Sequence, residues 1–138
     1  MTKYGAKKVT YDGITFDSKM EKDYYIYLKE LKAKGEILDF ELQPSFELQP
    51  KFEKDGVKYR PIKYVADFKI YYPDGKIEIV DVKGMETTDF KLKAKIFNYK
   101  FKEALKLIKY SKIDGGWITL EDYKKAVKRR KAEKAKHK

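Results

Sequence analysis

The stretch from Tyr64 to Gly84 decides the fold: Tyr-Val-Ala-Asp-Phe-Lys-Ile-Tyr-Tyr-Pro-Asp-Gly-Lys-Ile-Glu-Ile-Val-Asp-Val-Lys-Gly. Two apolar runs flank the turn signal Tyr-Pro-Asp-Gly at 72–75. They predict one strand at about 62–72 and a second at about 77–83, paired antiparallel. We therefore expect a β-hairpin at the centre of the fold.

Three charged side chains interrupt the apolar runs of this hairpin. Asp67 lies in the first strand, and Asp81 and Lys83 lie in the second. Charges within strands are costly to bury unless they are paired or bind a metal. Because residues i and i+2 share a face, Asp81 and Lys83 point the same way, with Val82 packing behind. The alternative is an exposed strand face that carries a simple charge pair.

The hairpin can bring Asp67 beside Asp81. Two carboxylates at that separation repel each other unless a hard cation lies between them, and oxygen ligands suit Mg²⁺ or Mn²⁺. A neighbouring lysine such as Lys83 can stabilise developing negative charge or position a water molecule. The pattern predicts a metal-dependent site.

Composition restricts the class of protein. The chain has 138 residues, which suits one domain, and a formal net charge of +11, which favours an anionic partner. Nine Lys/Arg and three Asp/Glu lie in residues 119–138. There are no cysteines, so disulfides and thiolate metal sites are excluded. No apolar run reaches the length of a membrane span and no signal-peptide core is found, so we expect an intracellular, cytoplasmic protein with no membrane partner.

The rest of the chain predicts helices around the hairpin. Ser18 is a candidate N-cap for a helix that ends at Gly35, with Glu21 completing a capping box. A small hairpin at 9–16 precedes it, and strands are expected at about 37–42 and 45–52. Later elements are a helix from Thr88 to about 99, a strand at 104–111 preferred over a helix, a loop at Gly115-Gly116, and a helix from Thr119 that frays beyond Arg130. We expect an α/β (α+β) domain at 1–118, with a central mixed sheet flanked by helices, and a basic helix or tail at 119–138.

Glu21 provides a possible third carboxylate. At 100° per residue it lies at the border of the apolar stripe of its helix, and the sheet that this helix must cover carries Asp67 and Asp81. Its two roles, as a capping residue and as a site residue, do not exclude each other.

Here the chain resembles the PD-(D/E)XK nuclease superfamily over roughly residues 4–111. The resemblance rests on a helix glutamate (Glu21), a strand aspartate (Asp67) and an acid-x-lysine in the next strand (Asp81 to Lys83). It looks closer still to a family of small phage and prophage proteins without an assigned function. That likeness is carried by four stretches: Lys3-Tyr-Gly-Ala-Lys-Lys, Asp12-Gly-Ile-Thr-Phe-Asp-Ser, the twice-occurring Glu-Leu-Gln-Pro, and Asp81-Val-Lys-Gly. Ala66 stands where the superfamily motif has proline, and Asp81 where glutamate is common.

The resemblance implies a restriction-endonuclease-like core and phosphodiester hydrolysis. Glu21, Asp67 and Asp81 would hold one or two Mg²⁺, with the Val82 carbonyl as a further ligand. Lys83 would orient or help activate the attacking water. Polar residues near the site assist in members of this fold, and the candidates here are Gln43, Gln49, Lys91 and Lys95, of which Gln43 and Lys95 are favoured. The alternative is that the glutamines are turn and strand-end residues and that the lysines form a solvated helix face.

Basic side chains on the two later helices are candidate nucleic-acid contacts, with a solvated helix face and a solubilising tail as the alternatives. They are Lys91, Lys95, Lys128, Arg129 and Arg130.

The function hypothesis is a Mg²⁺-dependent DNA endonuclease selective for branched DNA, such as a junction resolvase in phage recombination or replication. A resolvase would be a homodimer, because two strands must be cut symmetrically. One alternative is a non-catalytic nucleic-acid-binding module with the same fold. Another is a subunit that cuts only within a larger complex.

Overall fold

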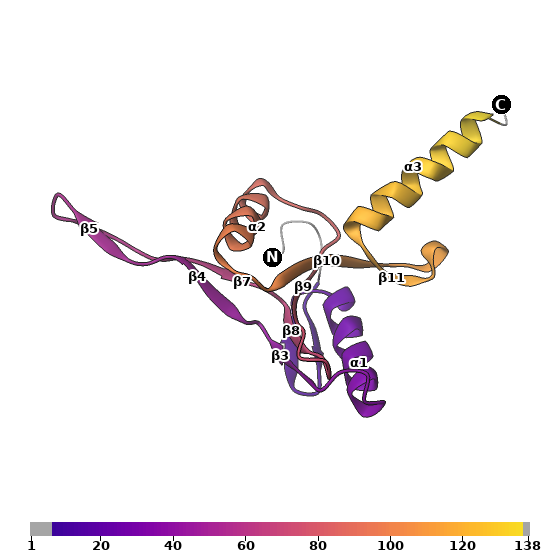
Figure 1. Ribbon diagram of the computed structural model, residues 1–138, viewed down its shortest axis with the longest axis horizontal. Helices are drawn as coiled ribbons and strands as arrows, with labels where there is room; N and C mark the ends of the chain where they lie inside the picture. The colour runs from indigo at the N-terminus through magenta and orange to yellow at the C-terminus, as the bar shows by residue number, and fades with distance from the viewer. Residues whose placement is uncertain (1–6, 137–138) are drawn as a thin grey trace.

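A five-stranded mixed sheet forms the centre of the computed structural model, which describes residues 7–136 (Figure 1). The strand order is β11-β10-β9-β8-β3; β9 and β10 are parallel and the other neighbours antiparallel. With three α-helices, this sheet confirms the predicted α+β class. The strands are β3 (Asp39–Leu42), β8 (Phe68–Tyr71), β9 (Ile77–Val82), β10 (Ala104–Ser111) and β11 (Gly116–Thr119).

Helices cover both faces of the sheet. The alternation of β9 sends Val80 and Val82 into the core beneath α1 (Lys19–Ala33), and Ile79 into the core beneath α2 (Thr88–Lys100). α2 connects the parallel strands β9 and β10 as a crossover helix. Asp81 shares the α2 side with Ile79, so the predicted placement of Val82 behind it is confirmed.

The local signals at the helix ends mostly agree with the structure. Ser18 caps α1, because its hydroxyl oxygen accepts a hydrogen bond from the Glu21 N–H at 3.1 Å. Gly35, with φ +76°, follows the end of this helix as expected. The N-cap of α2 is Thr87, one residue before the predicted Thr88, because the Thr87 hydroxyl accepts from the Phe90 N–H.

The long first strand of the central hairpin is not one element, so that prediction is wrong. The structure divides it into β7 (Ile62–Val65) and β8, with a break at Ala66-Asp67. β8 stays in the central sheet, whereas β7 leaves it and pairs with β4 (Ser45–Gln49). At the break the backbone N–H of Ala66 donates to the Pro44 carbonyl instead of to a strand in the central sheet.

A two-stranded ribbon extends from the β4–β7 pair. It is formed by β5 (Phe52–Lys54) and β6 (Val57–Tyr59), joined by a turn at Asp55-Gly56. Pro50 and Pro61 separate the two ladders, because proline has no N–H to donate. The predicted strand at 45–52 is therefore two strands. Figure 1 shows this ribbon, with β5 near its tip, standing away from the central sheet.

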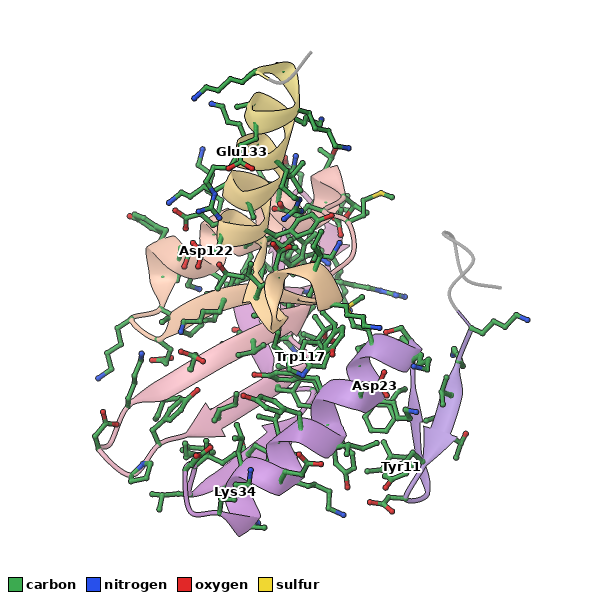
Figure 2. All side chains as sticks on the ribbon, turned by 90° about the vertical axis from the view of Figure 1, so that its right-hand side faces the viewer. Tyr11, Asp23, Lys34, Trp117, Asp122 and Glu133 are labelled. Carbon is green, nitrogen blue, oxygen red and sulfur yellow. The ribbon has the colours of Figure 1, made fainter. Side chains whose placement is uncertain are left out.

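The C-terminal part differs from the expectation in two places. The predicted loop at Gly115-Gly116 is reduced to a turn at Gly115, which lies between a short 3₁₀ helix, η1 (Lys112–Asp114), and the edge strand β11, whose first residue is Gly116. Trp117 on β11 packs edge-on against Tyr24 of α1, with ring centroids 4.9 Å apart, which explains why this short strand joins the sheet (Figure 2). The last helix, α3 (Leu120–Lys136), begins after Thr119 as predicted, but it continues beyond Arg130 to Lys136.

The N-terminal hairpin is confirmed as β1 (Val9–Tyr11) and β2 (Ile14–Phe16) around Asp12-Gly13, both of which have positive φ. Within residues 7–136, no helix is long and apolar enough to cross a membrane.

Candidate active site

The break between β7 and β8 places Asp67 directly against the end of β9. The Asp67 N–H donates to Asp81 Oδ1 at 2.8 Å, and the Val82 N–H donates to Asp67 Oδ2 at 2.8 Å. Each carboxylate thus accepts a backbone N–H from the other's strand. These reciprocal bonds hold the two acids side by side, as the sequence predicted.

Tyr64 is a site residue that the sequence pattern did not reveal. Its hydroxyl donates to Asp81 Oδ2, and both side chains are buried. The Tyr64 ring packs against Phe90 and Phe97 of α2, which keeps the hydroxyl in place. The only signal in the sequence was that Tyr64 lies three residues before Asp67. The structure shows that the predicted strand is broken between these two residues.

Glu21 comes from the first turn of α1 and faces Asp67. The Ser18 hydroxyl donates to Glu21 Oε2 at 3.2 Å, so the capping serine also orients the Glu21 carboxylate. Burial raises the pKa of Glu21, although its interactions with Asp67 and Ser18 act in the opposite direction. Glu21 thus lies beside the N-cap of α1 and next to Asp67, and its role as a site residue stays a prediction.

The three carboxyls form an electrostatically crowded group. Burial is the largest cause that raises the pKa of Asp67 to about 7, and the nearby Glu21 carboxyl is the second largest. Burial and the charge of Asp67 raise the pKa of Asp81 to about 6, although the Tyr64 hydroxyl opposes this shift. Carboxyls with such pKa values are a common feature of sites where a cation or a proton is exchanged.

Lys83 lies on the α2 side, with Nζ 4.6 Å from the centre of the Phe90 ring. In residues 7–136 no ion pair joins it to Glu21, Asp67 or Asp81. The buried Glu78 of the same strand shows the contrast, because it is paired with Lys106 at 2.8 Å and accepts from the Tyr72 hydroxyl. Glu78 is a neutralised structural acid, whereas none of the three site acids is in an ion pair with a lysine or arginine in the described chain.

Gln43 and Lys95 are placed differently. The Gln43 N–H donates to the Asp67 carbonyl at 2.9 Å, and Gln43 has the uncommon φ of +50°. Its backbone thus supports the break at Asp67, while its side chain is exposed. Lys95 is exposed on α2, and no contact found in the described chain connects it with the three carboxyls.

The oxygen atoms at the site are the kind of ligand that a hard divalent cation prefers, but their arrangement fits a cation only in part. Carboxylate and carbonyl oxygens are what Mg²⁺ and Mn²⁺ prefer, and the crowding of Glu21 and Asp67 is what a cation would relieve. However, both oxygens of Asp81 accept bonds from the protein itself. Accordingly, no group of three or more His, Cys, Asp or Glu side chains in residues 7–136 is arranged to hold a metal ion. Asp81 would have to exchange its bond to Tyr64 for a cation.

The predicted nucleic-acid contacts lie on two surfaces. Lys91 lines a hollow with Lys109 and Lys124, next to Gly84 at the end of β9. On α3, Lys128 and Arg129 are exposed, whereas Arg130 is paired with Asp114 at 2.6 Å. Figure 2 shows α3 projecting from the sheet, with Asp122 near its start and Glu133 towards its far end.

A family match covers most of the chain. A family model described as "Protein of unknown function (DUF1064)" matches residues 1–121. The chain belongs to this family. The DUF1064 match includes Glu21, Asp67, Asp81 and Lys83, and it ends in the first turn of α3. No curated protein and no solved structure matches the chain.

Substituting Tyr64 by phenylalanine is expected to lower the free energy of unfolding by about 1.5–3 kcal/mol at pH 8, because the hydrogen bond to a charged carboxylate disappears while the ring stays packed. The decrease should be smaller at pH 5, below the pKa of about 6 of Asp81, where the carboxyl is neutral. Urea unfolding at both pH values measures this. Tyr99→Phe, at a side chain that is 91% exposed, is the control. An equal decrease at both pH values would contradict a charge-assisted bond.

Proposed function

We propose that this protein is a Mg²⁺-dependent endonuclease that hydrolyses phosphodiester bonds of DNA, with the restriction-endonuclease-like core of the PD-(D/E)XK superfamily. The observation that carries the proposal is that Asp67 lies against both Asp81 and Glu21, with Lys83 directly after the end of β9. These residues come from a helix, a strand start and a strand end, in the chain order of the motif that the sequence resembles.

In this proposal Glu21, Asp67, Asp81 and the Val82 carbonyl hold Mg²⁺ or Mn²⁺. A bound divalent ion would polarise the scissile phosphate and lower the pKa of a bound water. The chain's own residues supply the position: the Val82 N–H orients Asp67, the Ser18 hydroxyl orients Glu21, and Tyr64 holds Asp81 until a ligand replaces that bond.

Lys83 would act on the water and on the phosphate. Its ammonium group lies over the Phe90 ring, which limits its motion without neutralising its charge. A free ammonium at this place can hydrogen-bond the attacking water and stabilise the charge that develops as the P–O bond to the leaving sugar oxygen breaks.

Basic side chains next to the site offer a path for the DNA backbone. The hollow with Lys91, Lys109 and Lys124 opens beside Gly84, immediately after Lys83; Lys124 is paired there with Glu86 at 3.0 Å, so Lys91 and Lys109 are the basic side chains that it offers to a phosphate. Together with α3 and the net charge of +11, it favours a polyanion as the substrate.

As the substrate class we propose branched DNA, such as four-way junctions in phage recombination or replication within the cytoplasm of the host cell. No sequence-reading motif is recognised in the chain, which favours recognition of DNA structure over recognition of sequence. Symmetric cutting of a junction would require a homodimer.

One observation favours a second candidate, a nucleic-acid-binding module without catalysis. Both oxygens of Asp81 are bonded within the protein, so one of the proposed ligands already has partners. In this case the three acids would be structural, and the basic surfaces alone would carry the function.

Cleavage assays distinguish these functions. The purified protein is incubated with four-way junctions, flaps, linear duplex and single strands, with and without Mg²⁺. We expect Mg²⁺-dependent cleavage of branched DNA that Lys83→Ala lowers by about 10²-fold or more. Lys34→Ala, at the exposed end of α1 far from α3, serves as the control and should cut normally (Figure 2). Cleavage that survives Lys83→Ala would contradict the site assignment, and salt-sensitive binding without any cleavage would favour the binding module.

Removing residues 129–138 is expected to weaken DNA binding and to flatten its dependence on salt. For each phosphate that the shortened chain no longer neutralises, the slope of log K against log salt should fall by about 0.9 on duplex DNA. Fluorescence anisotropy between 50 and 200 mM salt would measure both changes, and Mg²⁺ binding at the carboxylates should be unaffected. An unchanged affinity and slope would show that residues 129–138 do not contact DNA.

A further inference from the structure

The proposed active site does not explain why the chain has the β5–β6 ribbon. Figure 1 shows it extending away from the sheet, on the side opposite to α3. All side chains of residues 50–60 are exposed. A two-stranded hairpin alone is marginally stable, and one that is held this far from the core is expected to have a partner.

Apolar and aromatic side chains are concentrated on this ribbon. Phe52 and Tyr59 are directly opposite each other, with ring centroids 4.6 Å apart and planes 8° apart. They are 44% and 45% exposed, and Val57 is 51% exposed. Exposed apolar side chains that gather in one place mark an interaction surface.

The charge of the ribbon selects the kind of partner. Residues 50–60 contain four basic and two acidic side chains. Within the described chain, Lys51, Lys58 and Arg60 are in no ion pair. A second copy of this chain, with its own net charge of +11, would bring like charges together, whereas a polyanion would be complementary.

The two faces of the ribbon suit the two parts of a nucleic acid. Strand alternation places Phe52 and Tyr59 on one face and Lys58 on the other, where Lys58 is directly opposite Glu53. Aromatic faces stack on bases that are not paired, and lysine and arginine contact phosphates. A two-stranded ribbon also has the width that a DNA groove admits.

We propose that the β5–β6 ribbon is a second DNA-contacting element, which places Phe52 and Tyr59 against unpaired bases and Lys58 and Arg60 against the backbone. The proposal deepens the proposed function, from which it takes DNA as the partner. It explains how a small protein without a sequence-reading motif distinguishes a branch point from a continuous duplex.

The test measures binding and not cleavage, in EDTA, with the full chain. The probes are a four-way junction, a duplex, and a duplex with an unpaired 2-aminopurine. Phe52→Val/Tyr59→Val removes the aromatic faces while keeping strand-forming residues. Lys58→Gln/Arg60→Gln removes two charges. The controls are Leu38→Ser, at a 60% exposed side chain in the loop after α1, and Lys34→Gln, at the exposed end of α1.

We expect the aromatic variant to bind the junction and the unpaired probe about 5- to 150-fold more weakly, with little change on duplex, and to lose quenching of 2-aminopurine. The charge variant should lower the salt slope by about 2 on all probes. The controls should bind as the wild type does.

Two results would overturn the proposal. In the first, both ribbon variants bind every probe as the controls do. In the second, sedimentation shows a wild-type dimer that the aromatic variant turns into a monomer while DNA affinity is unchanged, so the ribbon covers a second copy instead. Failure of the proposed function is separate, because absence of cleavage with ribbon-dependent binding leaves this proposal standing.

Discussion

Asp67→Asn is expected to lower Mg²⁺-dependent DNA cleavage on the order of 10³-fold and, at pH 8 without metal, to raise the free energy of unfolding by about 1–3 kcal/mol. The asparagine oxygen can still accept the bond from the Val82 N–H, so the fold at the break is kept. The charge next to Glu21 and Asp81 is removed, and with it the repulsion and the desolvation that raise the pKa of Asp67 to about 7. A substitution that abolishes activity and stabilises the protein indicates that the acid is retained for function.

The pH dependence of the free energy of unfolding shows why removing the Asp67 charge should stabilise the metal-free protein. The pKa of Asp67 is raised from 3.8 to about 7 in the folded protein, so the folded form keeps a proton that the unfolded chain has released. Between about pH 4 and pH 7 the metal-free protein should therefore lose stability as the pH rises, with no further loss from Asp67 above that range.

Urea unfolding in EDTA at pH 5 and pH 8 measures this difference in wild type and in Asp67→Asn, which should show a smaller loss. Asp74→Asn is the matched control, because Asp74 also accepts a backbone N–H, that of Lys76, but is exposed in a turn. A variant of Asp67 that is less stable than wild type at pH 8 would show that the carboxylate is structural.

Phe97→Ala is expected to produce the largest loss of stability, about 3–5 kcal/mol. Phe97 is fully buried in the core between α2 and the sheet, where it packs on Phe46, Tyr64 and Phe101. The cavity left by its removal would also release the Tyr64 ring, whose hydroxyl holds Asp81. Thermal or urea unfolding gives the stability.

Tyr99→Ala on the same helix is the control for Phe97→Ala. Tyr99 is 91% exposed, so its replacement should change the free energy of unfolding by no more than about 0.5 kcal/mol. Equal effects of the two substitutions would contradict the packing of α2 on the sheet.

The elements with strong local signals could be predicted from the sequence. Ser18 and Gly35 delimit α1, the turn at 72–75 forms as expected, and the alternation of β9 places Val82 behind Asp81. The contact between Asp67 and Asp81 also follows from pairing two strands around a known turn.

The features that depend on contacts distant in sequence could not be predicted. The break at Ala66-Asp67 arises because β7 pairs with β4, a choice that no pattern within residues 62–72 reveals. The hydrogen bond between Tyr64 and Asp81 depends on that break. Likewise, β11 is held against α1 by the packing of Trp117 on Tyr24, a contact between residues distant in the sequence. Such contacts decide how the carboxylates are held, whereas the local sequence decides which carboxylates are present.

Anomalous diffraction from a crystal soaked in Mn²⁺ would show whether the three acids form a cation site. We expect an Mn²⁺ peak at roughly 2.0–2.3 Å from oxygens of Glu21 and Asp67, with the Asp81 carboxylate released from Tyr64, and no peak there in Asp67→Asn. A saturating soak that leaves Asp81 bonded to Tyr64, with no Mn²⁺ between the carboxylates, would contradict the cation site.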